Sequence, residues 1–202
     1  MEEPVTDLVS QRGWIKIDYR HMRWIPCLPV FPDGEDRQSW ATGFAEAWWE
    51  ASGLEHDERH VKGMARDLEA VHEQAYATLP CHLGMLHLPD PRLTPLFVGF
   101  GIWQARGDRD SQLRRLVRVD EPGLEKLPIV DDFTTPALGP GLRSLAYVRE
   151  GQTMMGFLNY AWRSEAHETA LRVFTGSPDL GRLQRAIPDI DELTAGITFI
   201  PR

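Results

Sequence analysis

The sequence predicts an α+β protein: a central antiparallel sheet, helices on both of its faces, and a helical hairpin near the N-terminus. Two consecutive segments, 36–52 and 57–79, carry apolar residues at helical spacing, and only a short connection separates them. Strand-like segments bounded by turn signals fill most of the remaining chain. One of these segments, 154–162, is apolar on both faces, which is typical of a strand inside a covered sheet.

Length and charge limit the functions that are open to the chain. At 202 residues it is long enough for a substantial core, and we expect one domain over 1–202. The net charge of −8 argues against nucleic-acid binding, which needs clustered Lys and Arg. No segment approaches the roughly 18 apolar residues of a membrane helix, and no secretory signal opens the sequence. We therefore expect a cytoplasmic protein in which Cys27 and Cys81 stay reduced and buried.

The N-terminal part is predicted to form two strands, 14–17 and 24–30, ahead of the helical hairpin. Pro26 and Pro29 place the second strand at a sheet edge or make it irregular, because proline cannot donate to a neighbouring strand. The helix over 57–79 has the clearest period of the chain. Its apolar stripe consists of Val61, Ala65, Leu68, His72, Ala75 and Leu79.

Strands dominate the second half of the sequence. They are expected at 82–88, 96–105, 113–119, 142–149, 154–162, 168–175 and 197–200. The Pro- and Gly-rich segment 121–141 is predicted to be a connection. Ser177 and Pro178 predict the start of a final helix, as N-cap and first helical residue, and Pro188 is expected to interrupt that helix.

Catalytic and cofactor motifs do not stand out. We find no nucleophile elbow, dinucleotide fingerprint or phosphate loop in the sequence. His56 and His60 have the spacing of a zinc protease helix, but Asp57 stands where those enzymes have glutamate. We interpret the segment as a polar helix start and predict neither a metal nor a cofactor. A metal protein that uses His56 and His60 is the weakest alternative.

Trp49 is the first candidate for binding a protein partner. It is turned by about 100° from Trp48 around the helix and shares its side with the small residues Thr42, Ala45 and Ser52. A large aromatic side chain among small ones on an outer face suits a protein interface. The alternative is that a connecting segment of the same chain covers it.

A basic stretch is the second candidate for partner binding. It follows the turn at 106–110 and extends into the strand expected at 113–119. Charged residues of this kind often protect an edge strand, and they also suit an acidic partner or a phosphate. The stretch contains Arg109, Arg114, Arg115 and Arg118.

Several short motifs carry a resemblance to known proteins. They are Trp24-Ile25-Pro26 with Leu28-Pro29, Asp36 with Trp40-Ala41, the segments 138–143 and 158–162, and the segments 174–180 and 189–193. With these motifs the chain resembles a family of actinobacterial proteins found near type VII secretion genes. Its C-terminal portion is similar to Mog1/PsbP-like domains of the LpqN type. The resemblance implies an α/β sandwich on an antiparallel sheet, and it implies no catalytic residue.

Two functions follow as hypotheses. The first is a non-enzymatic cytoplasmic accessory or adaptor domain that binds a protein partner of a secretion apparatus or another multiprotein assembly. The alternative is a small-molecule-binding protein or enzyme with a pocket between the sheet and the helical hairpin. His72, Tyr160 and Trp162 would line that pocket. For His72 alone, the simpler interpretation is a hydrogen-bonded histidine of the core.

Overall fold

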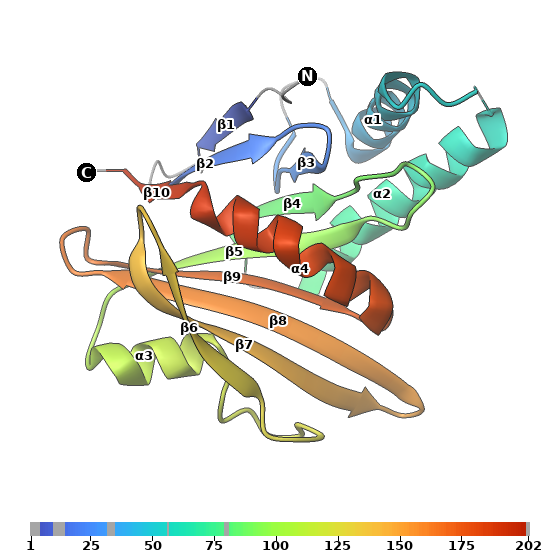
Figure 1. Cartoon of the computed structure of the whole chain (residues 1–202). Coiled ribbons are helices and arrows are strands. Elements are labelled where there is room, and N and C mark those ends of the chain that lie inside the picture. The colour runs from blue at the N-terminus through green and yellow to red at the C-terminus, as the bar shows by residue number, and fades with distance from the viewer. Residues whose placement is uncertain (1–4, 10–14, 32–34, 56, 79–80, 201–202) are drawn as a thin grey trace.

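The computed structural model describes residues 5–9, 15–31, 35–55, 57–78 and 81–200, and these form four helices and two sheets (Figure 1). The helices are α1 (Arg37–Ala51), α2 (Glu58–Thr78), α3 (Arg109–Leu116) and α4 (Leu180–Ala195). The strands are β1 (Val5–Val9), β2 (Ile15–Arg20), β3 (Trp24–Cys27), β4 (Leu83–His87), β5 (Leu96–Gln104), β6 (Ile129–Thr135), β7 (Gly139–Glu150), β8 (Thr153–Ser164), β9 (Thr169–Ser177) and β10 (Ile197–Phe199). The predicted fold class is confirmed.

The large sheet contains seven strands in the order β3-β4-β5-β9-β8-β7-β6, and every neighbouring pair is antiparallel. The small sheet has the order β1-β2-β10, so the first and last strands of the fold flank β2. β3 lies at the edge of the large sheet, as Pro26 predicted. β8 lies inside it between β7 and β9, as the apolar segment 154–162 predicted.

One face of the large sheet packs against α4 and the small sheet. Side chains two residues apart on a strand share a face, and Leu158, Tyr160 and Trp162 of β8 all enter this core. α4 contributes Leu183 and Ile190 to the same core. Figure 1 shows α4 crossing this face of the large sheet.

The opposite face carries two separate helical layers. The hairpin of α1 and α2 packs near the β3 end of the sheet, in a core that includes Leu86 and Leu88. α3 packs on β7 and β8 instead, where Leu113 and Val117 contact Ala161. α3 therefore covers the middle strand β8 on this face.

The residues predicted as a strand at 113–119 lie mainly in helix α3. Asp108 caps this helix, because its Oδ1 accepts the backbone N–H of Ser111 at 2.8 Å. Leu113 and Val117 are four residues apart and buried, which is helical spacing and not strand alternation. The spacing of these two apolar residues was visible in the sequence. We predicted a strand nevertheless, because a turn at 106–110 between two strands would form a β-hairpin.

The segment 121–141 contains a strand that we did not predict. β6 pairs with β7 and lies at the far edge of the large sheet as the structure describes it. Its exposed residues include Ile129, Asp131 and Asp132. An edge strand with so little burial carries no clear apolar alternation, and so its sequence resembles a loop.

The final helix begins later than predicted and is not interrupted. Ser177 ends β9, and the N-cap of α4 is Asp179, whose Oδ1 accepts the N–H of Arg182 at 2.8 Å. Pro188 lies inside α4. Because Gln184 and Pro188 are both on the exposed side of the helix, water can satisfy the carbonyl that proline leaves free. Among the described residues, none of the helices is both long and apolar enough to cross a membrane.

Candidate functional site

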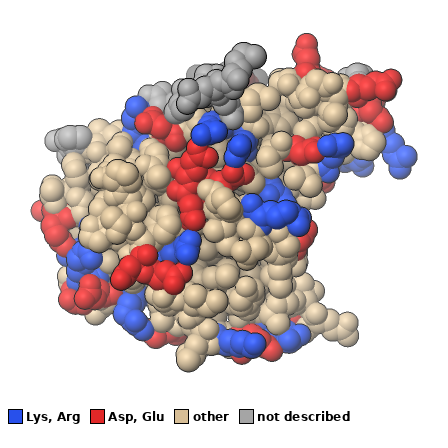
Figure 2. All heavy atoms as spheres, in the orientation of Figure 1, with Lys and Arg blue, Asp and Glu red and all other residues tan. Residues whose placement is uncertain are grey.

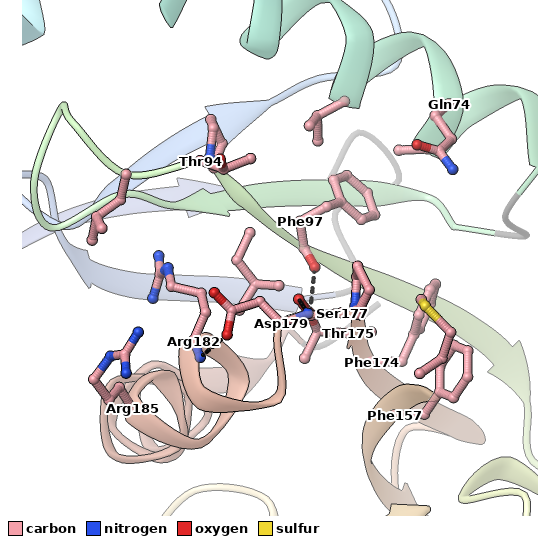
Figure 3. A pocket seen from close by; sticks show the side chains of 18 of the residues that line it. Gln74, Thr94, Phe97, Phe157, Phe174, Thr175, Ser177, Asp179, Arg182 and Arg185 are labelled. Atoms are coloured by element: carbon pink, nitrogen blue, oxygen red, sulfur yellow. Dashed lines mark hydrogen bonds between the residues drawn. The ribbon is translucent and has the colours of Figure 1, made fainter. Parts of the chain in front are cut away.

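A cavity of about 930 Å³ lies on the sheet face that carries the α1–α2 hairpin and α3. α2 forms one wall with Val71, Gln74 and Ala75. The floor comes from β5, β8 and β9, and the cavity extends past the end of β9 to the first turns of α4. Figure 3 shows α2 and α4 on opposite sides of this space. The cavity is thus bordered by α2 on one side and by the first turns of α4 on the other.

Aromatic rings lie flat over glycines on this face of the sheet. A Cβ atom on Gly99 would lie 2.5 Å from Cζ of Phe174, and one on Gly176 would lie 2.7 Å from Cδ1 of Phe157. Real Cβ atoms do not approach so closely, and each ring therefore occupies the space above a glycine. Phe157, Phe174 and Phe97 all line the cavity, which gives it an apolar aromatic floor (Figure 3).

The charge of the cavity is opposite to that of the chain. Among the described residues, Asp179 is the one carboxylate that lines it. On the face shown in Figure 2, by contrast, acidic and basic side chains are interspersed. The arginines that line the cavity are Arg92, Arg118, Arg172, Arg182 and Arg185. In a protein of net charge −8, this concentration makes the cavity a distinct basic and aromatic site.

Two of these arginines are held by carboxylates just outside the cavity. Arg118 donates to both carboxylate oxygens of Glu121, which raises the pKa of Arg118. Arg92 donates from Nε and Nη2 to the two oxygens of Asp90, at 2.9 and 2.5 Å. Their charges are already compensated, and both side chains are pre-positioned.

Arg172 lies against the aromatic floor. Its guanidinium carbon is 4.6 Å from the centre of the Phe174 ring, and its Nη2 donates to Oδ1 of Asn159 at 2.6 Å. Within the described part of the chain it forms no salt bridge. Burial, together with the positive charge of the nearby Arg118, lowers the pKa of Arg172 to about 10.

Arg182 is the most buried of the five arginines, with 6% of its surface exposed. Its Nη2 donates to the backbone carbonyl of His87 at 2.8 Å, while its Nε has no hydrogen-bond partner among the described residues. No described carboxylate forms a salt bridge with it. Burial lowers the pKa of Arg182, and the positive charge of Arg185 lowers it further.

Two of the hydroxyl groups that line the cavity, those of Thr175 and Ser177, already have partners. Thr175 donates to the carbonyl of Phe97 at 2.7 Å, which joins β9 to β5. Ser177 Oγ accepts the N–H of Asp179 at 3.0 Å, one residue before α4 begins. These side chains fix the strand ends around the cavity.

The expectation that Trp49 lies exposed is wrong. The side chain is 4% exposed, and its Nε1 donates to the carbonyl of Glu55 at 2.9 Å. The imidazole of His60 stacks on the indole, with ring centres 5.7 Å apart. The connection to α2 and the start of that helix therefore cover Trp49, which was the alternative interpretation. The helical wheel of α1 alone could not show what the next segment covers.

His72 has the simpler of its two predicted roles. It is 6% exposed, and its Nε2–H donates to the carbonyl of Leu28 at 2.8 Å. Its ring stacks on Phe31 at 4.8 Å. Burial lowers the pKa of His72, an effect that the bond to Leu28 partly opposes. His72 faces this aromatic core and is not among the residues that line the cavity.

A cavity lies on the hairpin side of the sheet, but Tyr160 and Trp162, which were predicted to line a pocket there, do not line it. Both are completely buried on the opposite face, in the core with α4. Tyr160 donates to Oδ1 of Asp191 at 2.5 Å, which ties β8 to α4. Side chains alternate along β8, so its odd-numbered positions, Phe157 and Asn159, line the cavity instead. Sequence alternation could not tell which face lies under which helix.

The predicted basic stretch falls on two different surfaces. Arg114 and Arg115 are exposed on α3, whereas Arg109 donates to the carbonyl of Pro140 at 2.7 Å. Arg118 follows α3 and is the one member that lines the cavity. The residues therefore do not form the single hairpin patch that we had expected.

His56 lies outside the described residues, and Nδ1 of His60 is 2.8 Å from Oδ2 of Asp57. Cys27 is buried as expected, and Cys81 is half-buried. Burial raises the pKa of both thiols, to about 11 for Cys81.

Arg182 and Arg185 are the cavity residues that sequence reasoning missed most clearly. They lie three residues apart on α4 and so share one side of the helix. Arg182 lies between the apolar residues Leu180 and Leu183, a position where a charged residue needs a structural explanation. This was a usable signal, although it named no partner.

Comparisons with known proteins give the fold a counterpart. No protein-family model and no curated protein matches the chain. Among solved structures it is similar to LpqN of Mycobacterium tuberculosis, described as involved in cell envelope biogenesis. The TM-score is 0.53 at 7% sequence identity, over 98% of this chain and 91% of LpqN. At this identity the likeness shows an LpqN-like α+β fold alone.

Proposed function

We propose that this chain is a non-enzymatic accessory domain that binds a small, largely apolar molecule in the cavity between α2, the large sheet and α4. The aromatic floor is the observation that supports this most directly. Phe174 and Phe157 line a space of about 930 Å³, within the range of small-molecule sites. Such rings offer apolar area together with stacking interactions.

The polar groups of the cavity are suited to binding. In the part of the chain that the structure describes, its lining contains no histidine, cysteine or glutamate. The hydroxyls of Thr175 and Ser177 are engaged in bonds that hold β5, β9 and α4 together. The guanidinium groups of the lining arginines can therefore donate hydrogen bonds to a ligand.

The likeness to LpqN gives this function a setting. Because LpqN is described as involved in cell envelope biogenesis, a process of the cell envelope is one context for a binding domain of this fold. The cytoplasmic location and the link to type VII secretion stay predictions of the sequence. Purifying tagged protein from fractionated cells of the native organism tests both.

The neutral fluorescent dye phenylnaphthylamine tests for an apolar site. We expect saturable binding of one dye per chain. Gln74→Trp places a large ring at the wall of the cavity from an exposed position on α2 and is expected to weaken binding at least tenfold. The same substitution at exposed Gln38 of α1, which does not line the cavity, is the matched control. Absent binding, or equal binding by the Gln74→Trp and Gln38→Trp variants, contradicts the proposal.

A protein partner is the second candidate function, and α3 is the surface that favours it. Arg114 and Arg115 are exposed there in an acidic chain, and Arg114 has only a 3.7 Å contact with the exposed Asp120. With Trp49 buried, α3 carries this hypothesis alone. A charge-reversal experiment for it is given in the Discussion.

A further inference from the structure

We infer that the ligand of this cavity is an apolar organic acid whose anionic group binds Arg182 and Arg185 while its apolar part lies on Phe174 and Phe157. This inference rests on the proposed function and names the chemical class that the site would select. Figure 3 shows the two arginines on α4 at one end of the cavity and the two phenylalanines at the other. The ligand would span this length, with its charge at one end.

Burial of Arg182 is the first argument. A guanidinium with 6% exposure costs free energy unless charged or polar partners replace water. Arg182 has one bond to a carbonyl, and its Nε has no partner among the described residues. A carboxylate, sulfonate or phosphate on the ligand would supply the missing negative charge. Guanidinium matches such groups because it offers parallel N–H donors.

Arg185 adds a second positive charge at the same end. It lies one turn beyond Arg182 on the same side of α4, is exposed, and forms no salt bridge with any described residue. The repulsion between the two guanidinium groups lowers the pKa of Arg182. A shared anion would relieve that repulsion. The pair therefore favours an anion more than either arginine alone does.

The other arginines are less available to a ligand. Arg118 and Arg92 are paired with Glu121 and Asp90. Arg172 uses Nε and Nη2 on the side chain of Asn159 and lies over Phe174. Of the five arginines, Arg182 and Arg185 therefore make the fewest hydrogen bonds to described residues, and both lie at the α4 end of the cavity.

Two described carboxylates lie near Arg182 and act to raise its pKa: Asp189, which is bound by His87 and Arg23, and Asp179. Of the two, only Asp179 lines the cavity. Its Oδ1 accepts the N–H of Arg182 at the start of α4. A carboxylate at a helix N-terminus interacts favourably with the helix dipole. Two arginines and one capped aspartate leave the α4 end positive.

Two dyes with the same ring system test the inference. Anilinonaphthalene sulfonate carries one sulfonate, and phenylnaphthylamine carries none. We expect the sulfonate dye to bind about tenfold more tightly, the scale of one charge-assisted hydrogen bond, and to lose this preference as salt rises. Arg182→Gln and Arg185→Gln should each reduce the preference and leave the affinity for the neutral dye unchanged.

Arg115→Gln on α3 is the matched control, because it removes the same charge from an exposed residue outside the cavity. If Arg182→Gln fails to fold, the exposed Arg185→Gln alone decides. Equal affinities of the wild type for both dyes, or a preference unchanged in the Arg185→Gln variant, overturns the inference while neutral-dye binding still supports the proposed function. If neither dye binds, the proposed function itself fails.

Discussion

Nε2 of His87 lies 2.7 Å from Oδ2 of Asp189 and joins β4 to α4 across 102 residues of sequence. Arg23 forms a salt bridge with the other oxygen of the same carboxylate. Asp189 thus connects the loop between β2 and β3, the large sheet and the final helix. The backbone carbonyl of His87 also accepts the bond from Arg182, so this buried cluster borders the α4 end of the cavity.

The His87 cluster predicts a loss of stability in acid. Burial lowers the pKa of His87, the bond to Asp189 opposes this shift, and the charges of Arg182 and Arg23 support it, so that the pKa lies at about 4. The unfolded chain, with an ordinary histidine pKa near 6.5, takes up a proton first as the pH falls. The stability that the neutral His87 contributes is therefore fully present above pH 6.5 and is lost as the pH falls toward 4. The free energy of unfolding should fall by roughly 3 kcal/mol over this range.

Urea denaturation at a series of pH values between these limits measures the effect. His87→Gln keeps a side-chain donor for Asp189 and removes the titrating group. We expect its free energy of unfolding to vary less with pH than that of the wild type. Parallel pH profiles for the two proteins would show that His87 is not the responsible group.

Trp49 is predicted to stabilise the fold and not to bind a partner. Trp49→Ala removes a buried indole that contacts His60 and donates to the carbonyl of Glu55, and it should cost about 3 kcal/mol or more. Trp49→Phe keeps most of the buried ring area and loses the hydrogen bond, for a cost of about 1 kcal/mol. Chemical denaturation distinguishes the two. A denaturation midpoint of Trp49→Ala equal to that of the wild type would contradict the burial of Trp49.

Two glycines are predicted to respond in opposite directions to the same substitution. Gly99→Ala introduces a methyl group where the ring of Phe174 lies, and overpacking of this kind costs about 1–3 kcal/mol. Gly43 lies exposed in α1 with nothing within 4 Å of an added Cβ, so Gly43→Ala should stabilise the helix by about 0.5–1 kcal/mol. Thermal denaturation measures both. Equal shifts of the denaturation midpoint for the two variants would contradict the packing of the Phe174 ring over Gly99.

The exposed arginines of α3 test the second candidate function. If α3 meets an acidic protein partner, Arg114→Glu with Arg115→Glu should abolish a salt-sensitive interaction that a wild-type bait shows in the native host. Thermal stability should change little, because both side chains are exposed. Lys62→Glu, at an exposed position of α2, is a control with the same kind of charge change. Undiminished capture by the double variant would exclude α3 as the interface.

Local patterns in the sequence were enough for the main elements. The apolar stripe of α2 predicted a buried helix face, and Val61, Ala65 and Leu68 are indeed buried. The apolar run 154–162 predicted an interior strand, which is β8. These predictions succeed because helical and strand periods are set by backbone geometry and by burial, and both leave a repeat in the sequence. β6 left no such repeat, because an edge strand buries little.

Relations between elements required the tertiary structure. The sequence alone determined an α+β protein with a helical hairpin and a covered sheet. Only the structure decided that α3 covers β8, that the Glu55 connection covers Trp49, and that Arg182 faces a cavity floored by Phe174. The physical reason is that periodicity assigns a side chain to a face of its own element, whereas the partner of that face is set by contacts far apart in the chain.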